Sequence, residues 1–336
     1  MKHHIKIREE DIYKSKNPYK EITFVDNLIF WIEKIEIKNE TSNAIFTRPF
    51  NLKESIPQNL TEGNFLIKSS FHGYGGKSYQ CIHIDSKIWI VWIDQKSKSL
   101  WLQIFIINKS KDKNNNYLIK SGKPKKLTKS YRGNFDSSFV IVNQNLLMGL
   151  FERENNDYLF LIDVDKEEQK LRIQKKFKNF AGSLSANFNN KFISWIEWDE
   201  YMPWENNDLF IAEINLQGNL MKIIKFVDSK INAFKLVSFF QPYWIHENTL
   251  VCAEDSSGWW NLLFLEIKTI DKIKIKQRII KPFYEYGNPQ WISGISLSAC
   301  INLCSSLFNK AVAMVYNLNT KKRRWMLYYH ECRRRI

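Results

Sequence analysis

The chain has 336 residues, of which 44% are hydrophobic and 15% aromatic, and its formal net charge is +15. This apolar content can build a substantial core and excludes a globally disordered chain. The 12 tryptophans and 23 phenylalanines favour β-strands. The lysines are scattered among asparagines and isoleucines, so we interpret them as solvated surface and do not expect nucleic acid as a partner. The dense basic cluster is the C-terminal "KKRRWMLYYHECRRRI".

Short apolar runs that end in a polar residue recur along the chain. They are "LIFWIE" ending at Glu33, "IWIVWID" at Asp94, "LLMGLFE" at Glu152, "FISWIE" at Glu197 and "TLVCAE" at Glu254, with a weaker echo, "ISLSACIN", at Asn302. Successive endpoints lie about 45 to 61 residues apart, in the range of propeller blades. After most of the runs, a polar turn leads into another strand-like run, which is the signature of a β-hairpin. No long segment has the 3.6-residue period of a helix.

The runs are apolar at consecutive positions, so both faces of these strands are expected to be covered. In a β-propeller each blade packs between two neighbours, which buries both faces of its middle strands. We therefore predict an all-β fold, a β-propeller of four-stranded antiparallel blades. About six blades of an expected seven are visible, in one incomplete domain over residues 1–336.

Six tryptophans are predicted to fill the gaps between blades. The adjacent pair Trp259 and Trp260 in "EDSSGWWNLLFLE" should point to opposite faces of one strand. A stacking platform for a ligand is the alternative for this pair. The six predicted positions are Trp195, Trp204, Trp244, Trp259, Trp260 and Trp291.

The sequence contains no recognisable catalytic or metal-binding motif. "GISLS" from Gly294 lacks the closing glycine of a nucleophile elbow, so Ser296 is not expected to be catalytic. The six histidines show no metal-ligand spacing. The odd and irregular cysteines favour buried thiols in a reducing compartment; they are Cys81, Cys252, Cys300, Cys304 and Cys332. We expect no cofactor, no metal, no signal peptide and no membrane span, and hence a cytoplasmic protein.

Two loops stand out. "FHGYGGKSY", residues 71–79, combines His72, Tyr74, Gly75 and Gly76. It is either a tight turn held by its histidine or a loop that faces a substrate or partner. "WDEYMPWENND", residues 198–208, is either an anchored loop or a binding lip.

Several stretches resemble one family, the prolyl oligopeptidase family of serine peptidases, and within it the N-terminal propeller of the dipeptidyl aminopeptidase/acylaminoacyl-peptidase type. "KSSFHGYGGKSY" is similar to its His-Glu-Tyr-Gly-Gly segment, and "FISWIEWDEYMPWENNDLFIAEI" to its Trp-Asp-(x)-Met-Pro-Trp stretch. "FFQPYWIHENTLVCAEDSSGWWNLLFLEI" resembles its Gln-Pro-(x)-Trp and Gly-Trp-Trp-Asn blade, and "EYGNPQWISGIS" its Gly-(x)-Pro-Gln-Trp segment. The matches are in order and span about residues 15 to 300.

The resemblance implies a propeller that restricts access to a C-terminal α/β-hydrolase domain with a Ser-Asp-His triad. That domain is not in this sequence, so the resemblance implies a truncated, split or frameshifted peptidase that is inactive alone. Its implied partners are the hydrolase domain and peptides. Gly73 stands where the family usually has Glu, which puts any contact of that carboxylate with a substrate amine or the partner domain in doubt. The alternative is a stand-alone propeller that binds a protein or peptide.

Overall fold

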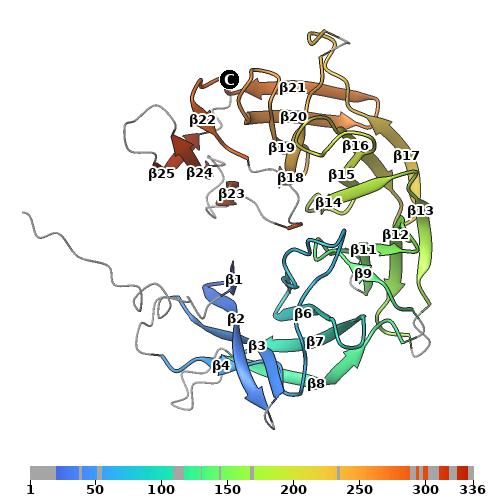
Figure 1. The fold of residues 1–336 in the computed structure, drawn as a ribbon, viewed down its shortest axis with the longest axis vertical. Coiled ribbons are helices and arrows are strands. Elements are labelled where there is room, and N and C mark those ends of the chain that lie inside the picture. The colour runs from blue at the N-terminus through green and yellow to red at the C-terminus, as the bar shows by residue number, and fades with distance from the viewer. Residues whose placement is uncertain are drawn as a thin grey trace, which may run out of the picture. The chain divides into compact units, whose positions relative to one another are not determined.

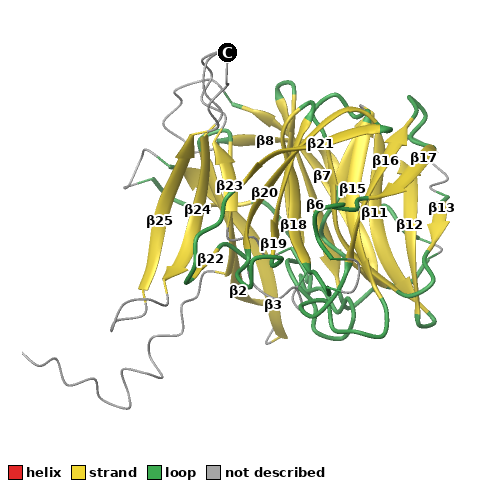
Figure 2. Ribbon diagram, turned by 90° about the horizontal axis from the view of Figure 1, so that it is seen from above, coloured by secondary structure: helices red, strands yellow, loops and turns green. Residues whose placement is uncertain are grey.

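The computed structural model describes residues 20–37, 40–50, 55–108, 117–129, 131–143, 145–166, 170–232, 235–287, 293–294, 298–301, 310–317 and 324–331. Every regular element within these ranges is a β-strand, as Figure 2 shows. The all-β fold expected from the sequence is therefore confirmed. The described residues contain no helix long and apolar enough to cross a membrane.

The described strands form six sheets, in most of which neighbours in space are also neighbours in sequence. The first three sheets comprise β1 (Lys20–Val25), β2 (Leu28–Ile37), β3 (Glu40–Pro49) and β4 (Gln58–Asn59); β5 (Tyr79–Ile84), β6 (Lys87–Asp94), β7 (Ser99–Ile107) and β8 (Leu118–Lys126); and β9 (Asn134–Phe135), β10 (Val140–Asn143), β11 (Leu146–Arg153), β12 (Asn156–Asp163) and β13 (Arg172–Lys176).

The other three sheets follow in chain order. They comprise β14 (Phe180–Ala186), β15 (Phe192–Trp198), β16 (Asp208–Ile214) and β17 (Leu220–Lys225); β18 (Phe239–His246), β19 (Thr249–Glu254), β20 (Asn261–Thr269) and β21 (Lys272–Arg278); and β22 (Tyr284–Glu285), β23 (Ser298–Ile301), β24 (Lys310–Asn317) and β25 (Arg324–Glu331). The predicted hairpins are present, because β11 with β12, β15 with β16, and β19 with β20 pair antiparallel.

The described residues fall into two compact units. Unit 1 takes those within Met1–Ile67, Cys81–Ile90 and Gln103–Pro124, and unit 2 those within Lys68–Gln80, Val91–Leu102 and Lys125–Ile336. The expectation of one domain over the whole chain stays a prediction. In unit 2 the sheets β9–β13, β14–β17 and β18–β21 succeed one another in chain order, from green to orange in Figure 1.

The core of unit 2 lies between successive sheets. One apolar cluster joins side chains of β10–β12 to those of β14–β16, and a second joins β15 and β16 to β18–β20. All six side chains of β19 are buried, as are the first five of β20. Both faces of these strands are therefore covered, as the apolar runs predict, and the alternation of a half-exposed sheet is absent from them.

Candidate functional site

The "FHGYGG" loop, residues 71–76, is held in a tight left-handed conformation. His72 has a φ of 50° and Gly75 a φ of 78°. The N–H of Gly75 donates to the carbonyl oxygen of Phe71 at 2.9 Å. A Cβ added to Gly75 would lie 2.5 Å from the carbonyl oxygen of Ser69, so this position requires glycine for both its φ and its space.

The side chain of His72 ties this loop to two sheets. Its Nε2 lies 2.7 Å from Oδ2 of Asp157 in β12, and the same oxygen accepts the N–H of Ala181 in β14 at 2.8 Å. The main-chain N–H of His72 donates to Oε2 of Glu152 in β11 at 3.1 Å. The side chain of Asp157 is 2% exposed and that of His72 14%. The buried carboxylate of Asp157 therefore holds both His72 of the loop and the backbone of β14 in place.

Three aromatic rings surround the imidazole of His72. The ring of Phe71 stacks on it with centroids 3.8 Å apart, while Phe180 and Trp198 meet it edge-on at 5.2 and 5.4 Å. The hollow beside these rings has room for about one water molecule. Its lining consists of Phe71, His72, Gly75, Gly182, Ser183, Trp198 and Ser293. This small space, lined by Phe71, His72, Trp198 and small residues, does not accommodate a peptide.

The second half of the loop holds a segment distant in sequence. Gly76 and Ser293 form a parallel β-bridge, in which Ser293 N–H donates to Gly75 O at 3.2 Å and Lys77 N–H donates to Ser293 O at 3.0 Å. The hydroxyl of Ser293 donates to the carboxylate of Asp136, which is fully buried. The glycine loop is therefore a junction between the sheets β9–β13 and β14–β17 and residue 293.

Replacing Gly76 by alanine should break this bridge. The added Cβ would overlap the carbonyl of Ser293, a backbone atom that cannot move aside cheaply. We expect a loss of about 2 kcal/mol in the free energy of unfolding and faster hydrogen exchange at the N–H of Lys77 and Ser293. Gly73→Ala is the matched control: its φ is 78° and nothing lies within 4 Å of the new Cβ. It should cost only about 1 kcal/mol of backbone strain and keep the bridge protected. Equal exchange in both variants would refute the steric argument.

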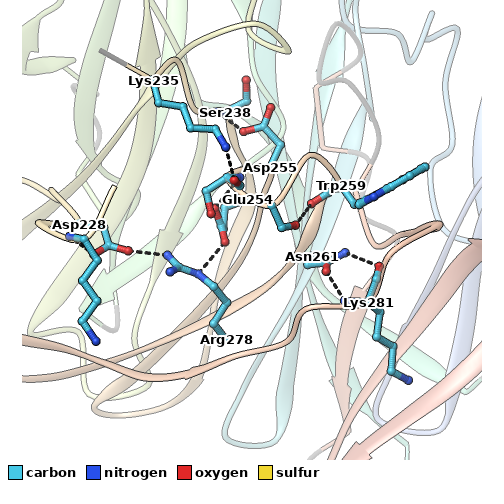
Figure 3. A network of polar contacts seen from close by, with 12 residues as sticks. Asp228, Lys235, Ser238, Glu254, Asp255, Trp259, Asn261, Arg278 and Lys281 are labelled. Atoms are coloured by element: carbon cyan, nitrogen blue, oxygen red, sulfur yellow. Dashed lines mark hydrogen bonds and ion pairs between the residues drawn. The ribbon is translucent and has the colours of Figure 1, made fainter. Parts of the chain in front are cut away.

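A second polar cluster lies where strands β19 and β21 end, at Glu254 and Arg278 (Figure 3). Arg278 of β21 lies between two carboxylates: its Nη2 is 2.6 Å from Oδ2 of Asp228, and its Nε 2.8 Å from Oε1 of Glu254. The side chains of Asp228 and Glu254 are 3% and 0% exposed. Glu254 also accepts the N–H of Ser256 at 2.8 Å. Burial would raise the pKa of Asp228, but the Lys230 N–H and the Arg278 guanidinium outweigh it and lower that pKa.

In two further carboxyl groups of this region, burial outweighs the opposing interactions and the pKa is raised. Burial raises the pKa of Asp255, although the N–H of Ser238 opposes the shift, and the Glu254 carboxylate raises it further. Burial also raises the pKa of Glu285, against the N–H of Trp260 that donates to it at 2.8 Å. Both groups accept a backbone N–H, so their role is to hold loop backbone in place.

The structure corrects the expected placement of the tryptophan pair. Trp259 and Trp260 lie in the loop between β19 and β20, outside any strand, and both are half-buried. The hairpin closes between Glu254 and Asn261, so six loop residues separate the strands and include both tryptophans. Trp260 meets Phe240 edge-on at 4.7 Å, and Trp259 contacts Phe283 at 5.1 Å.

Of the other predicted tryptophans, two lie in the core of unit 2. Trp195 is fully buried in the cluster that joins β10–β12 to β14–β16. Trp244 is 5% exposed and stacks at 6.0 Å on Phe192 of the preceding sheet. Trp204 is half-buried in the loop after β15, where the side chain of Asn207 ties Pro203 to β18 through hydrogen bonds of 2.7 and 3.0 Å. Trp291, and also Ser296, lie outside the described residues.

The polar partners that organise both clusters were not predictable from the sequence. Asp157 is the last residue of the "ENND" turn motif, and Arg278 ends a basic strand, so neither stood out. The acidic residues that end the apolar runs did indicate positions that hold other groups in place. Glu152 holds the glycine loop, Glu254 holds Arg278, and Glu197 accepts the indole N–H of Trp195 at 2.7 Å.

No group of three or more potential metal ligands occurs in the part of the chain that the structure describes. Cys81 and Cys252 are buried free thiols. Burial, and secondarily the Glu254 carboxylate, raises the pKa of Cys252, so this thiol is not a reactive nucleophile. The side chains of Cys300, Cys304 and Cys332 lie outside the described residues.

Successive sheets of this kind, built as hairpins with their middle strands buried on both faces, define a β-propeller. Solved structures are similar to it. A puromycin-hydrolysing peptidase from Mycobacterium tuberculosis matches with a TM-score of 0.71 and 16% identity, over 95% of this chain and 45% of its own. A puromycin hydrolase mutant complexed with PGG matches with a TM-score of 0.66 and 13% identity, over 96% and 53% of the two chains.

Prolyl oligopeptidase B from Galerina marginata matches with a TM-score of 0.48 and 8% identity, over 90% of this chain and 39% of its own, which is too slight to add to the argument. Scans against protein-family models and curated protein sequences give no match. The chain spans about half the length of the two puromycin hydrolases. The resemblance noted in the sequence is thereby confirmed at the level of the fold.

Proposed function

We propose that this chain is the non-catalytic, substrate-gating propeller of a serine peptidase of the prolyl oligopeptidase family, of the dipeptidyl aminopeptidase/acylaminoacyl-peptidase type. The observation that carries the proposal is the likeness to puromycin-hydrolysing peptidases over nearly all of this chain and about half of theirs. The ordered motif matches, from the glycine loop to the Gly-Trp-Trp-Asn loop, support it independently. The peptide bond would be cleaved by a hydrolase domain that this sequence does not include.

The glycine loop supports a role in contact with substrate or with the catalytic domain. Tyr74 of this loop is 72% exposed, and Phe180 of β14, which meets the ring of His72, is 45% exposed. The rest of the loop is pinned by Asp157, Glu152 and the bridge to residue 293. A rigid loop that presents exposed aromatic side chains can contact a partner without a large entropic cost of ordering.

Gly73 distinguishes this loop from the family pattern. Its φ of 78° suits glycine, and nothing lies within 4 Å of the position of a Cβ. A carboxylate there would be free to face a substrate amine, whereas glycine offers none. We therefore propose that this propeller does not select substrates by a carboxylate at position 73.

The test is to read the gene beyond codon 336 and to co-express this chain with any open reading frame that encodes a G-x-S-x-G elbow. We expect the two products to co-purify and to hydrolyse aminoacyl and acyl-peptide chromogenic substrates and puromycin, but not a folded protein. This chain alone should give no turnover. Turnover by the chain alone that a serine-directed reagent blocks would overturn the non-catalytic assignment.

If no hydrolase is encoded nearby and none co-purifies, the proposal fails and the second candidate takes its place. That candidate is a stand-alone propeller that binds a peptide or protein, and the exposed Tyr74 and Phe180 favour it. It requires the Tyr74→Ala variant to lose a partner that the wild-type chain retains in a pull-down.

A further inference from the structure

The lysines that are scattered in the sequence gather on particular strands of the fold. In four successive sheets, the edge strand that comes last in sequence contains Lys or Arg and no Asp or Glu. These strands are β8 "LIKSGKPKK", β13 "RIQKK", β17 "LMKIIK" and β21 "KIKIKQR". Each of these edge strands therefore carries a local excess of positive charge.

Four of the cations on the strands β13, β17 and β21 are already in ion pairs. Lys225 lies 2.7 Å from Asp208, Lys175 lies 3.4 Å from Glu197, and Lys222 forms an ion pair with Asp271. Arg278 is enclosed by Asp228 and Glu254. These side chains have little positive charge left for a ligand.

Lys272, Lys274 and Lys276 of β21 differ, and we call them the lysine row. All three are exposed, while the intervening Ile273 and Ile275 pack against the core. No ion pair or hydrogen bond engages the three ammonium groups within the described residues.

The geometry of the row follows from the strand. Alternation places Lys272 and Lys274 on the same face, about 6.6 Å apart along the strand. Lys276 occupies the bulge at which the register with β20 shifts. Glu266 is the acidic residue that β20 places opposite the row, across from Lys274, and no ion pair joins the two. Asp271, in the preceding turn, is engaged by Lys222.

We propose that the lysine row binds the phosphate backbone of a nucleic-acid strand. Unpaired ammonium groups in a row meet successive phosphates and release their counterions, and the net charge of +15 steers the polyanion to the protein. No exposed aromatic side chain lies on β21, so the row does not stack bases and its binding is independent of base sequence. The row also has no exposed large apolar side chain, which a membrane-binding surface would use.

The experiment measures binding of the full chain to a fluorescein-labelled, mixed-sequence single-stranded DNA oligonucleotide by fluorescence anisotropy, between about 50 and 200 mM salt. The triple variant Lys272→Gln, Lys274→Gln, Lys276→Gln should bind about tenfold more weakly, and its slope of log affinity against log salt should be smaller in magnitude by about 2. Inorganic polyphosphate should compete with the DNA for wild-type protein.

The matched control is Lys175→Gln, Lys222→Gln, Lys225→Gln, which removes the same number of charges from ion-paired positions. It should bind DNA nearly as well as wild type. An equal loss in both triple variants would assign the binding to net charge and overturn the proposal, as would unchanged DNA binding by the row variant.

Two other roles of the row give distinct results. Loss of binding to phosphatidylserine vesicles with unchanged DNA binding would assign the row to a membrane surface. Increased aggregation of the row variant with unchanged DNA binding would mean that these lysines only protect a sheet edge from pairing. Either result overturns the proposal.

Discussion

Replacing Glu254 by alanine should lower the free energy of unfolding by about 3 kcal/mol, the lower end of the cost of breaking a buried ion pair. Glu254 is fully buried at the end of β19, and its carboxylate faces the guanidinium of Arg278 and the N–H of Ser256. Without it, the half-buried guanidinium of Arg278 keeps only Asp228 as a partner, and the N–H of Ser256 loses its acceptor. The cost stays at the lower end because Asp228 still pairs with the guanidinium. Urea-induced unfolding followed by tryptophan fluorescence measures the change.

The charge and the hydrogen bonds of Glu254 can be separated by further variants. Glu254→Gln keeps an oxygen for the Ser256 N–H and should recover part of the loss. Glu213→Ala removes a carboxylate that is 34% exposed and 3.7 Å from Lys191, and it should cost less than about 1 kcal/mol. A loss for Glu254→Ala no larger than that of Glu213→Ala would contradict the buried-pair interpretation.

Replacing Asp157 by alanine should cost about 3 kcal/mol and release the glycine loop. One oxygen of this nearly buried carboxylate accepts from both His72 and the N–H of Ala181. Its removal leaves the N–H of Ala181 buried without an acceptor and the imidazole without its anchor. The stability loss should therefore be accompanied by faster hydrogen exchange in residues 71–77 and at Ala181.

The conservative variant tests whether geometry or charge matters at this junction. Asp157→Asn can place its one amide oxygen where Oδ2 lies, so that it still accepts from both the Ala181 N–H and His72 but without the charge, and about half of the stability should return. Asp208→Ala, which removes a carboxylate 37% exposed, is the control and should leave residues 71–77 protected. If Asp157→Ala leaves this exchange unchanged, the loop is not held by His72.

The strands were predictable because a strand that is buried on both faces has a continuous run of apolar residues in the sequence. The runs that end at Asp94, Glu152 and Glu254 coincide with β6, β11 and β19. The tryptophan pair shows the limit of this reasoning. "GWWN" has the composition of a strand, yet the length of the preceding turn decides where β20 begins, and the turn includes both tryptophans. Loop length depends on how the hairpin closes, which residue types alone do not specify.

Of the candidate site, only the unusual turn could be predicted from the sequence, through its glycines. "FHGYGG" identified an unusual turn, because glycines report on backbone conformation and close approach wherever they occur. The partners of the turn did not follow from sequence. Asp157 lies 85 residues from His72 in the sequence. Asp136, which accepts the hydroxyl hydrogen bond of Ser293, lies 157 residues from Ser293. Any of the chain's many carboxylates could have filled these places.

The sequence by itself determined the all-β class, the hairpin repeat and the propeller fold, because strand burial and turn chemistry are local properties. Only the tertiary structure decided which charges are paired. It places Arg278 between the buried carboxylates of Asp228 and Glu254 but leaves Lys272, Lys274 and Lys276 on the same strand exposed. The pairing of a charge depends on which distant segments meet it and on how much water they exclude, and both are set by the packing of one sheet against the next.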